Sequence, residues 1–185
     1  MQYVLSVMSS DHPGIVAGVS SAVEKLRGNV IACSQTVLGG YFTFITILDL
    51  PDTIPPQELA DLVRYSEGLG EDCQVIAQAN DKLLPTENGV FGGDTFVITA
   101  FGKDCPGIVK EFSRYLAGHD INITDLYGDL HGGDFVLISQ VTIPAGVNIN
   151  SLRDDLNEIG KKFGFTVRLQ HNNVFAATNQ IRMAE

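Results

Sequence analysis

The sequence predicts an α+β protein built from two tandem copies of one βαββαβ domain. A shift of 93 positions lays residues 3–51 over residues 96–144 without a gap, and 13 of these 49 positions carry the same amino acid. The repeat is about 77 residues long, which is the size of a domain and longer than a solenoid repeat. The chain has 185 residues, 44% of them hydrophobic, so it can bury the cores of two small domains.

Each copy begins with an apolar run of strand-forming residues and continues into a helix. The turns at residues 11–14 and 104–107 share the pattern Asp-x-Pro-Gly, and both can start a helix. The apolar residues that follow recur at helical spacing. A glycine, Gly28 in the first copy and Gly118 in the second, is expected to end each helix.

A β-hairpin, a second helix and a last strand complete each copy. Gly39-Gly40 and Gly132-Gly133 each lie between two strand-like runs, and a two-residue hairpin turn favours glycine because it needs positive φ. A second stretch of helical periodicity follows each hairpin. The predicted strands span residues 3–8, 29–38, 41–48 and 74–77 in the first copy and 96–101, 121–130, 135–143 and 166–169 in the second.

The order βαββαβ predicts a split-βαβ, ferredoxin-like sandwich. Two right-handed crossovers place both helices on one face of a four-stranded antiparallel sheet. The strands are apolar on both sides, so the other face also needs a cover, either the other copy or a second chain. We expect the first domain over residues 1–79, a linker rich in turn residues over 80–93, the second domain over 94–171 and a C-terminal tail over 172–185.

Composition and motifs argue against several classes of protein. The net charge of −10 provides no basic surface for direct contact with nucleic acid or an anionic membrane. Three cysteines, odd in number and far apart, indicate reduced thiols in the cytoplasm, and we expect Cys33 and Cys73 to fill core space. No Walker or dinucleotide-binding glycine motif is present, and the histidines lack metal-ligand spacing. We therefore expect no catalytic residue, no metal and no cofactor.

The repeated motifs resemble those of one domain family. Asp-x-Pro-Gly-Ile-Val at the first strand–helix turn, an Asn at the start of the second strand and Gly-Gly before an aromatic third strand occur in both copies. Together they resemble ACT domains, small ferredoxin-like modules that bind amino acids and regulate metabolic enzymes. The resemblance covers residues 1–79 and 94–171. Two such domains with little else in the chain resemble the glycine cleavage system transcriptional repressor group.

The resemblance implies a regulatory protein without catalysis that binds a free amino acid between packed ACT units. In the repressor group it implies control of transcription through a protein partner that binds DNA, and we expect a homodimer. The alternative is a regulatory subunit that controls an amino-acid metabolic enzyme by direct contact. The candidate ligand-binding residues are Asp11, His12, Pro13, Gly14, Ile15, Val16, Asn29, Asp104, Cys105, Pro106, Gly107, Ile108, Val109 and Asn122.

The loop before the first helix of each copy also suits a ligand on physical grounds. A helix N-terminus presents free N–H groups and a partial positive charge, which favour a carboxylate. Gly14 and Gly107 allow a ligand to approach the backbone closely. Asp11 and Asp104 can accept a hydrogen bond from an ammonium group.

Purely structural interpretations of the same residues remain open. The two aspartates of the loops equally suit the capping of the helices, and the glycines and prolines suit backbone geometry alone. Asn29 and Asn122 suit the turn between helix and strand. The copies differ where His12 gives way to Cys105, which is either a reactive thiol or an ordinary loop cysteine.

A short aromatic run raises RNA binding as a further alternative. Gly-Gly-Tyr-Phe-Thr-Phe from Gly39 resembles part of an RNA-recognition strand, in which Phe42 and Phe44 would stack on bases. No lysine or arginine precedes the run, and residues 1–79 carry a net charge of −6. We therefore expect both phenylalanines in the core.

Overall fold

The chain forms two units, and each is described by itself. The computed structural model describes residues 1–80 and 92–180, with side chains described up to residue 176. The chain divides between residues 83 and 84, within the expected linker, and each unit has its own hydrophobic core. Residues 81–91 lie outside the described part, so most of the expected linker is not characterised. We call residues 1–80 unit 1 and residues 92–180 unit 2.

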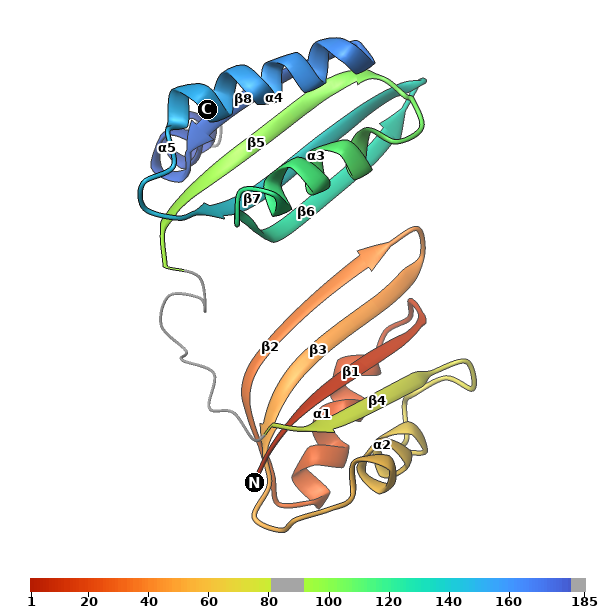
Figure 1. The fold of residues 1–185 in the computed structure, drawn as a ribbon. Helices are drawn as coiled ribbons and strands as arrows, with labels where there is room; N and C mark the ends of the chain where they lie inside the picture. The colour runs from red at the N-terminus through yellow and green to blue at the C-terminus, as the bar shows by residue number, and fades with distance from the viewer. Residues whose placement is uncertain (81–91, 181–185) are drawn as a thin grey trace. The chain divides into compact units, whose positions relative to one another are not determined.

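Both units have the predicted βαββαβ order, which confirms the fold class (Figure 1). The sheet orders are β2-β3-β1-β4 and β6-β7-β5-β8, and every neighbouring pair is antiparallel. Unit 1 contains β1 (Gln2–Ser10), α1 (Ile15–Lys25), β2 (Asn29–Leu38), β3 (Tyr41–Asp49), α2 (Pro56–Arg64) and β4 (Gln74–Ala79). Unit 2 contains β5 (Asp94–Lys103), α3 (Ile108–Ala117), β6 (Asn122–His131), β7 (Asp134–Ile143), α4 (Ile149–Phe163), β8 (Phe165–His171) and α5 (Asn172–Gln180).

The glycine pairs form the hairpin turns as predicted. Gly39 and Gly40 have φ of 59° and 83°, and Gly132 and Gly133 have φ of 60° and 85°. Two successive residues of positive φ give the turn twist that matches the twist of the flanking strands. These turns therefore set the register of β2 on β3 and of β6 on β7, with Leu38 opposite Tyr41 in unit 1.

The core of each unit lies between the helices and one face of the sheet. Along β3 the residues alternate between buried and more exposed positions, and Phe42 and Phe44 point inward at 3% and 5% exposure. These phenylalanines therefore belong to the core, and neither presents a ring for base stacking. Cys73 is buried, as expected, but Cys33 is exposed, so the expectation for Cys33 was wrong. Cys33 lies on the edge strand β2, which is exposed along nearly its whole length.

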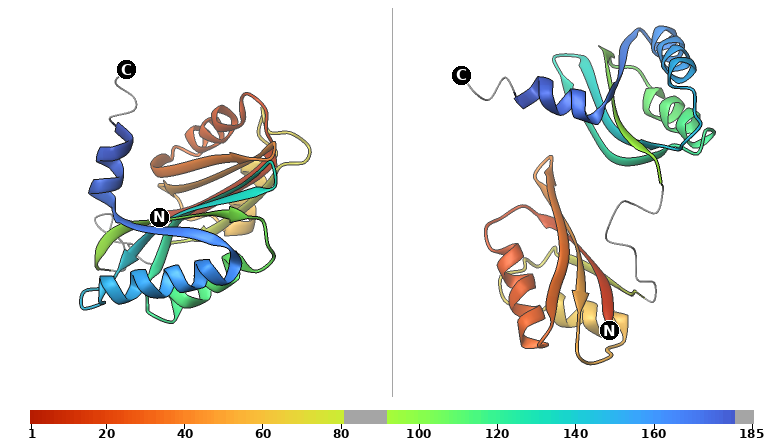
Figure 2. Two further views of the ribbon diagram at one scale, coloured as in Figure 1. Left: turned by 90° about the horizontal axis from the view of Figure 1, so that it is seen from above. Right: turned by 90° about the vertical axis from the view of Figure 1, so that its left-hand side faces the viewer.

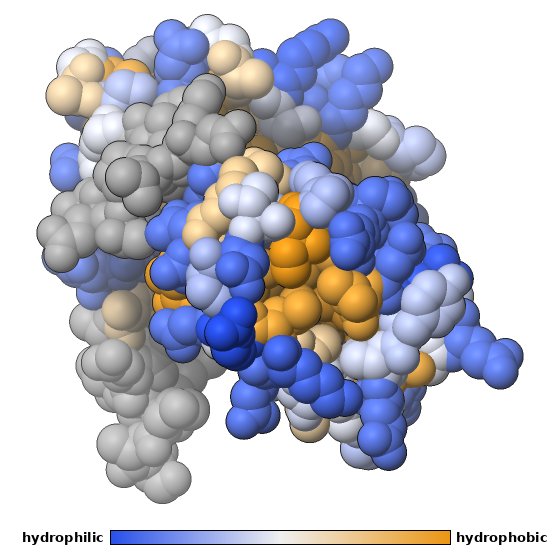
Figure 3. Space-filling view, turned by 90° about the horizontal axis from the view of Figure 1, so that it is seen from below, coloured by the Kyte–Doolittle hydropathy of each residue, from blue (hydrophilic) through white to orange (hydrophobic). Residues whose placement is uncertain are grey.

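The two units differ on the sheet face opposite their paired helices. In unit 2, residues 172–180 of the expected tail form α5, which packs against β5 and β8. Figure 2 shows α5 on the opposite side of that sheet from α3 and α4. In unit 1, Met8, Ile45 and Ile76 on neighbouring strands expose large apolar side chains. On the face drawn in Figure 3, hydrophobic residues gather into a patch bordered by hydrophilic ones.

Candidate functional site

The two Asp-x-Pro-Gly loops have the same backbone geometry. Gly14 is the N-cap of α1 with φ of 107°, and Gly107 is the N-cap of α3 with φ of 96°. Both values lie in the left-handed region, which favours glycine because a Cβ is strained there. A Cβ built on either residue would meet nothing within 4 Å, so the space beside each glycine is open. The glycines therefore satisfy a backbone requirement and also leave the start of each helix uncovered.

The first turns of α1 and α3 lack a side-chain cap. Among the described residues, no side chain accepts a hydrogen bond at either N-terminus, and Asp11 and Asp104 are exposed. The capping interpretation of these aspartates is therefore not what the structure shows. The backbone N–H of Asp11 instead donates to Gly40 at 2.9 Å, and that of Asp104 donates to Gly133 at 3.2 Å. Each loop is thus held against the hairpin turn beside it while its helix N–H groups stay available.

The hydrophobic residues after each glycine divide into two kinds. Ile15 and Ile108 are buried in the cores of their units, where they anchor the start of the helix. Val16 and Val109 are exposed on the first helical turn. Of this pair of positions, only the valines are therefore accessible to a ligand.

Asn29 and Asn122 lie far from the loops of their own units. Asn29 pairs with Asp49, which pairs with Gln2 at the start of β1, whereas the loop follows Ser10 at the end of β1. Eight residues of strand separate these ends, a distance of about 26 Å at 3.3 Å per residue. Asn122 is placed in the same way, opposite Thr142. The structure therefore does not bring either asparagine together with the loop of its unit.

In unit 1 a second segment, residues 66–72, lies against the loop. A Cβ on Gly18 would lie 2.7 Å from the carbonyl oxygen of Glu67, so helix α1 and this segment touch at the backbone. The Asp72 carboxylate accepts hydrogen bonds from the Ser10 hydroxyl at 2.6 Å and from the Ser10 N–H at 2.8 Å. These bonds, the hydroxyl bond first, hold the pKa of Asp72 below its ordinary value. The sequence analysis missed this segment because it has no counterpart in the second copy.

His12 contributes an unsatisfied nitrogen to the same place. Its Nδ1 lies 3.1 Å from the carbonyl oxygen of Pro13, which can only accept, so Nδ1 carries the proton. Nε2 is buried and has no partner within the described part of the chain. In the neutral ring this nitrogen offers a lone pair close to the Gly70 backbone. Unit 1 therefore places a free helix N-terminus beside Asp11, Asp72 and an imidazole acceptor.

Unit 2 keeps the loop but not its surroundings. Lys103, at the position of Ser10, forms an ion pair with Asp134 at 2.6 Å. The Cys105 thiol is half-buried and donates to the carbonyl of Phe163 at 3.8 Å, so it is held against the end of α4. Gly164 alone joins α4 to β8, and its φ of 73° makes the sharp turn. No segment equivalent to residues 66–72 therefore lies against the second loop.

The described residues do not extend the site toward metal chemistry. No group of His, Cys, Asp or Glu within residues 1–80 and 92–180 is arranged to hold a metal ion. No helix in those ranges is long and apolar enough to cross a membrane.

Fold and loops together define a class, a tandem pair of ferredoxin-like domains with an open glycine loop at the start of each first helix. The ACT domain family model matches residues 94–170. A UPF0237 protein of Listeria monocytogenes is 39% identical over 75 residues, which cover 40% of this chain and 82% of the relative. The UPF0237 protein of Methanopyrus kandleri is 34% identical over 86 residues, 46% of this chain and 96% of the relative. The chain belongs to the ACT domain family, as the motifs of its sequence predict.

Two solved structures resemble nearly the whole chain. A protein of unknown function from Galdieria sulphuraria has a TM-score of 0.73 at 23% identity, covering 92% of this chain and 97% of its own. A candidate glycine cleavage system transcriptional repressor has a TM-score of 0.66 at 17% identity, covering 92% of this chain and 98% of its own. At these identities the similarity is one of fold. The tandem arrangement of two such domains in one chain therefore recurs in other proteins.

Proposed function

We propose that this protein is a cytoplasmic, non-catalytic regulator that binds a free amino acid at the Asp-x-Pro-Gly loops. The observation that carries the proposal is the uncapped, solvent-open helix N-terminus behind Gly14 and Gly107, with an unbonded aspartate beside each. An amino acid carries a carboxylate and an ammonium group close together. The loop offers N–H groups for the first and a carboxylate for the second.

Unit 1 offers the more complete version of this site. The ligand carboxylate would accept from the N–H groups of the first turn of α1, where the helix dipole also favours negative charge. The ammonium would donate to Asp11, which lies near Asp72 and the free His12 nitrogen of the same loop region. Unit 2 offers only Asp104 for this purpose, since Lys103 already pairs with Asp134. We therefore expect tighter binding at the first loop.

The regulated target would be reached through a protein partner. The chain has a net charge of −10, so direct contact with DNA is unfavourable. The similarity in fold to a candidate transcriptional repressor supports control of transcription through a DNA-binding partner. Binding would act by population shift, since a ligand that favours one state of the protein changes what a partner finds.

A homodimer would form through the edge strand β2. This strand is exposed at every position except Val30 and carries no charged residue, whereas β6 carries Asp125 and Asp129. An uncharged edge with free N–H and C=O groups is a template for pairing with another strand, and a twofold axis would pair β2 with itself. Thr36→Lys would place a charge on that edge, so we expect this variant to sediment as a monomer where the parent chain sediments as a dimer.

The binding proposal is tested by thermal unfolding against each of the twenty amino acids at millimolar concentration. A ligand that binds only the folded state at a hundredfold excess over its Kd stabilises it by about 2.7 kcal/mol. We expect one amino acid, or a few related ones, to raise the midpoint, and Gly14→Val to remove most of that shift. Gly107→Val should remove less.

Gly146→Val is the matched control for both variants. Gly146 has φ of 94° and open space around its Cβ position, as Gly14 and Gly107 do, but it lies in the connection between β7 and α4. Each ligand shift is measured from the variant's own ligand-free midpoint, so the cost of backbone strain cancels. A shift that survives in Gly14→Val and Gly107→Val, or that disappears equally in Gly146→Val, would refute the loop as the site.

A further inference from the structure

Unit 2 contains a crevice between α3 and the inner face of its sheet, apart from the loop site. Its space amounts to about 290 Å³ including the open mouth. The walls are apolar, with Phe112 and Leu116 from α3, Leu126 from the edge strand β6 and Leu137 from β7. Leu126 is exposed, so the crevice opens beside the edge of the sheet.

One polar atom inside the crevice has no partner. Ser139 of β7 lines the crevice, is 3% exposed, and its buried Oγ makes no hydrogen bond within the described part of the chain. A buried hydroxyl without a partner costs roughly 1–3 kcal/mol. A site that keeps such a group unpaired in the free protein is suited to a ligand that supplies the missing partner.

The first unit shows what the same position does when it serves the fold alone. Its counterpart Thr46 is also buried, and its hydroxyl donates to the carbonyl of Ala32 on β2 at 2.9 Å. The counterpart of Leu137 in unit 1 is the larger Phe44, which fills the inner face of β3. In unit 2 the smaller pair Leu137 and Ser139 therefore leaves both space and an unbonded hydroxyl.

We propose that this crevice binds a small neutral molecule with a branched aliphatic body and one hydroxyl or carbonyl oxygen. The body would replace water against the apolar walls, and the oxygen would bond to the Ser139 hydroxyl. No charged side chain lines the crevice, so a carboxylate there would lose its hydration without a counter-charge. A volume near 290 Å³ lies at the lower limit of ligand pockets, which restricts the site to small molecules.

The crevice is independent of the proposed amino-acid site. Ser139 lies five residues along β7 from Asp134, which is at the loop end of the sheet, a separation of about 16 Å. One amino acid cannot span both places. Failure of either proposal therefore leaves the other standing, although α3 contributes to both sites through Val109 and the first helical turn.

The test uses the full chain with methyl-labelled Ile, Leu and Val and follows methyl chemical shifts by NMR. The probes are 2-methylpropan-1-ol and 3-methylbutan-2-one, with isobutyrate as the charged analogue and cyclopentane as the analogue without oxygen. We expect saturable shifts at Ile98, Leu116 and Leu137 with both oxygen-bearing probes. Isobutyrate should bind at least tenfold more weakly.

The variants come from the chain's own first unit. Leu137→Phe installs the side chain that unit 1 carries at this position, and we expect it to abolish the shifts at Ile98 and Leu116. Ser139→Ala should weaken the alcohol by about fivefold, the loss expected for one neutral hydrogen bond, and leave cyclopentane unchanged. Ser139→Thr serves as a second filling variant if Leu137→Phe disturbs the amide spectrum of unit 2.

Three results would overturn the proposal. The first is the absence of saturable shifts for either oxygen-bearing probe at 100-millimolar-scale concentrations, on the order of the weakest specific affinities. The second is binding that persists unchanged in a folded filling variant. The third is equal affinity for the alcohol and cyclopentane together with no effect of Ser139→Ala, which would leave only a non-specific apolar gap.

Discussion

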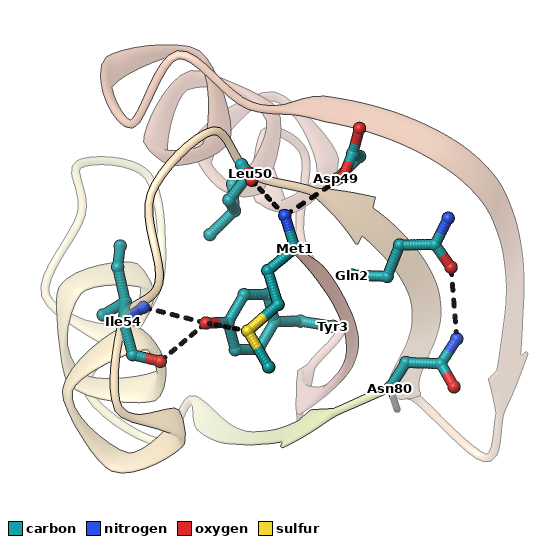
Figure 4. Close-up of polar contacts among 7 residues, drawn as sticks. All are labelled: Met1, Gln2, Tyr3, Asp49, Leu50, Ile54 and Asn80. Atoms are coloured by element: carbon teal, nitrogen blue, oxygen red, sulfur yellow. Dashed lines mark hydrogen bonds and ion pairs between the residues drawn. The ribbon is translucent and has the colours of Figure 1, made fainter. Parts of the chain in front are cut away.

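Tyr3→Phe removes one hydroxyl from the core of unit 1 and tests how this unit holds the segment between β3 and α2. Tyr3 is fully buried on the inner face of β1. Its hydroxyl accepts from the N–H of Ile54 and donates to the carbonyl of Ile54, each at 2.8 Å (Figure 4). A single side chain therefore satisfies both backbone groups of one loop residue.

The magnitude follows from these two bonds. Each neutral hydrogen bond contributes about 1 kcal/mol net, so their loss should cost unit 1 about 2 kcal/mol. Packing should not change, because Phe96 occupies the equivalent position of unit 2 and shows that the ring alone fits there. For a domain of this size, 2 kcal/mol corresponds to a fall in midpoint of about 8–16 °C.

The assay is urea unfolding followed by amide NMR signals of β1 and β5, which report the two units separately. Tyr65→Phe is the control, because Tyr65 is 79% exposed and its replacement should change stability by less than about 0.5 kcal/mol. Signals of β5 should be unaffected by either change. A loss at β1 that does not exceed the loss in Tyr65→Phe would refute the argument that the Ile54 bonds stabilise the unit.

Three further perturbations follow from single contacts. Gly18→Ala would set a Cβ 2.7 Å from the Glu67 carbonyl and should cost roughly 1–3 kcal/mol, measured by urea unfolding of unit 1; no loss would mean that residues 66–72 yield freely. Asp72→Asn should destabilise unit 1 near neutral pH; because folding lowers the pKa of Asp72 from 3.8, the difference from the parent chain should shrink as pH falls below that value, and a difference that persists unchanged in acid would contradict the Ser10 bonds as its cause. Lys103→Ala breaks an exposed ion pair and should change the stability of unit 2 by less than about 1 kcal/mol, so a larger loss would show that Lys103 has a second role.

The fold was largely predictable because its signals are local and occur twice. The glycine pairs at the hairpins and the alternation along β3 each state one physical requirement, positive φ in the first case and a buried face in the second. Gly28 shows where such reasoning fails. Helix α1 ends at Lys25, and the left-handed residue is Arg27 with φ of 56°. Gly28 is small because Leu50 packs directly against it, so glycine there marks a close contact and not the helix cap.

The candidate site was less predictable because it depends on contacts between distant segments. The loop glycines were found from their spacing. Asn29 was grouped with them because it follows the same helix, yet an antiparallel β2 must begin at the opposite end of the sheet. Residues 66–72 carried no repeated pattern: helix α2 has nine residues and α4 has fifteen, so the two copies diverge there. Only the folded chain shows that Asp72 reaches Ser10.

Comparison of the two units separates what folding requires from what binding would require. Residues shared by both loops include the glycines, whose φ is positive, and the isoleucines, which are buried, so folding alone accounts for them. Folding does not account for Asp11 and Asp104, which are exposed and cap no helix. Exposed residues that repeat without a structural contact are those for which a ligand is the remaining physical reason. Replacing Asp11 and Asp104 by alanine should therefore leave unfolding unchanged within about 0.5 kcal/mol while weakening amino-acid binding. A loss of stability without a loss of binding would return both residues to the fold.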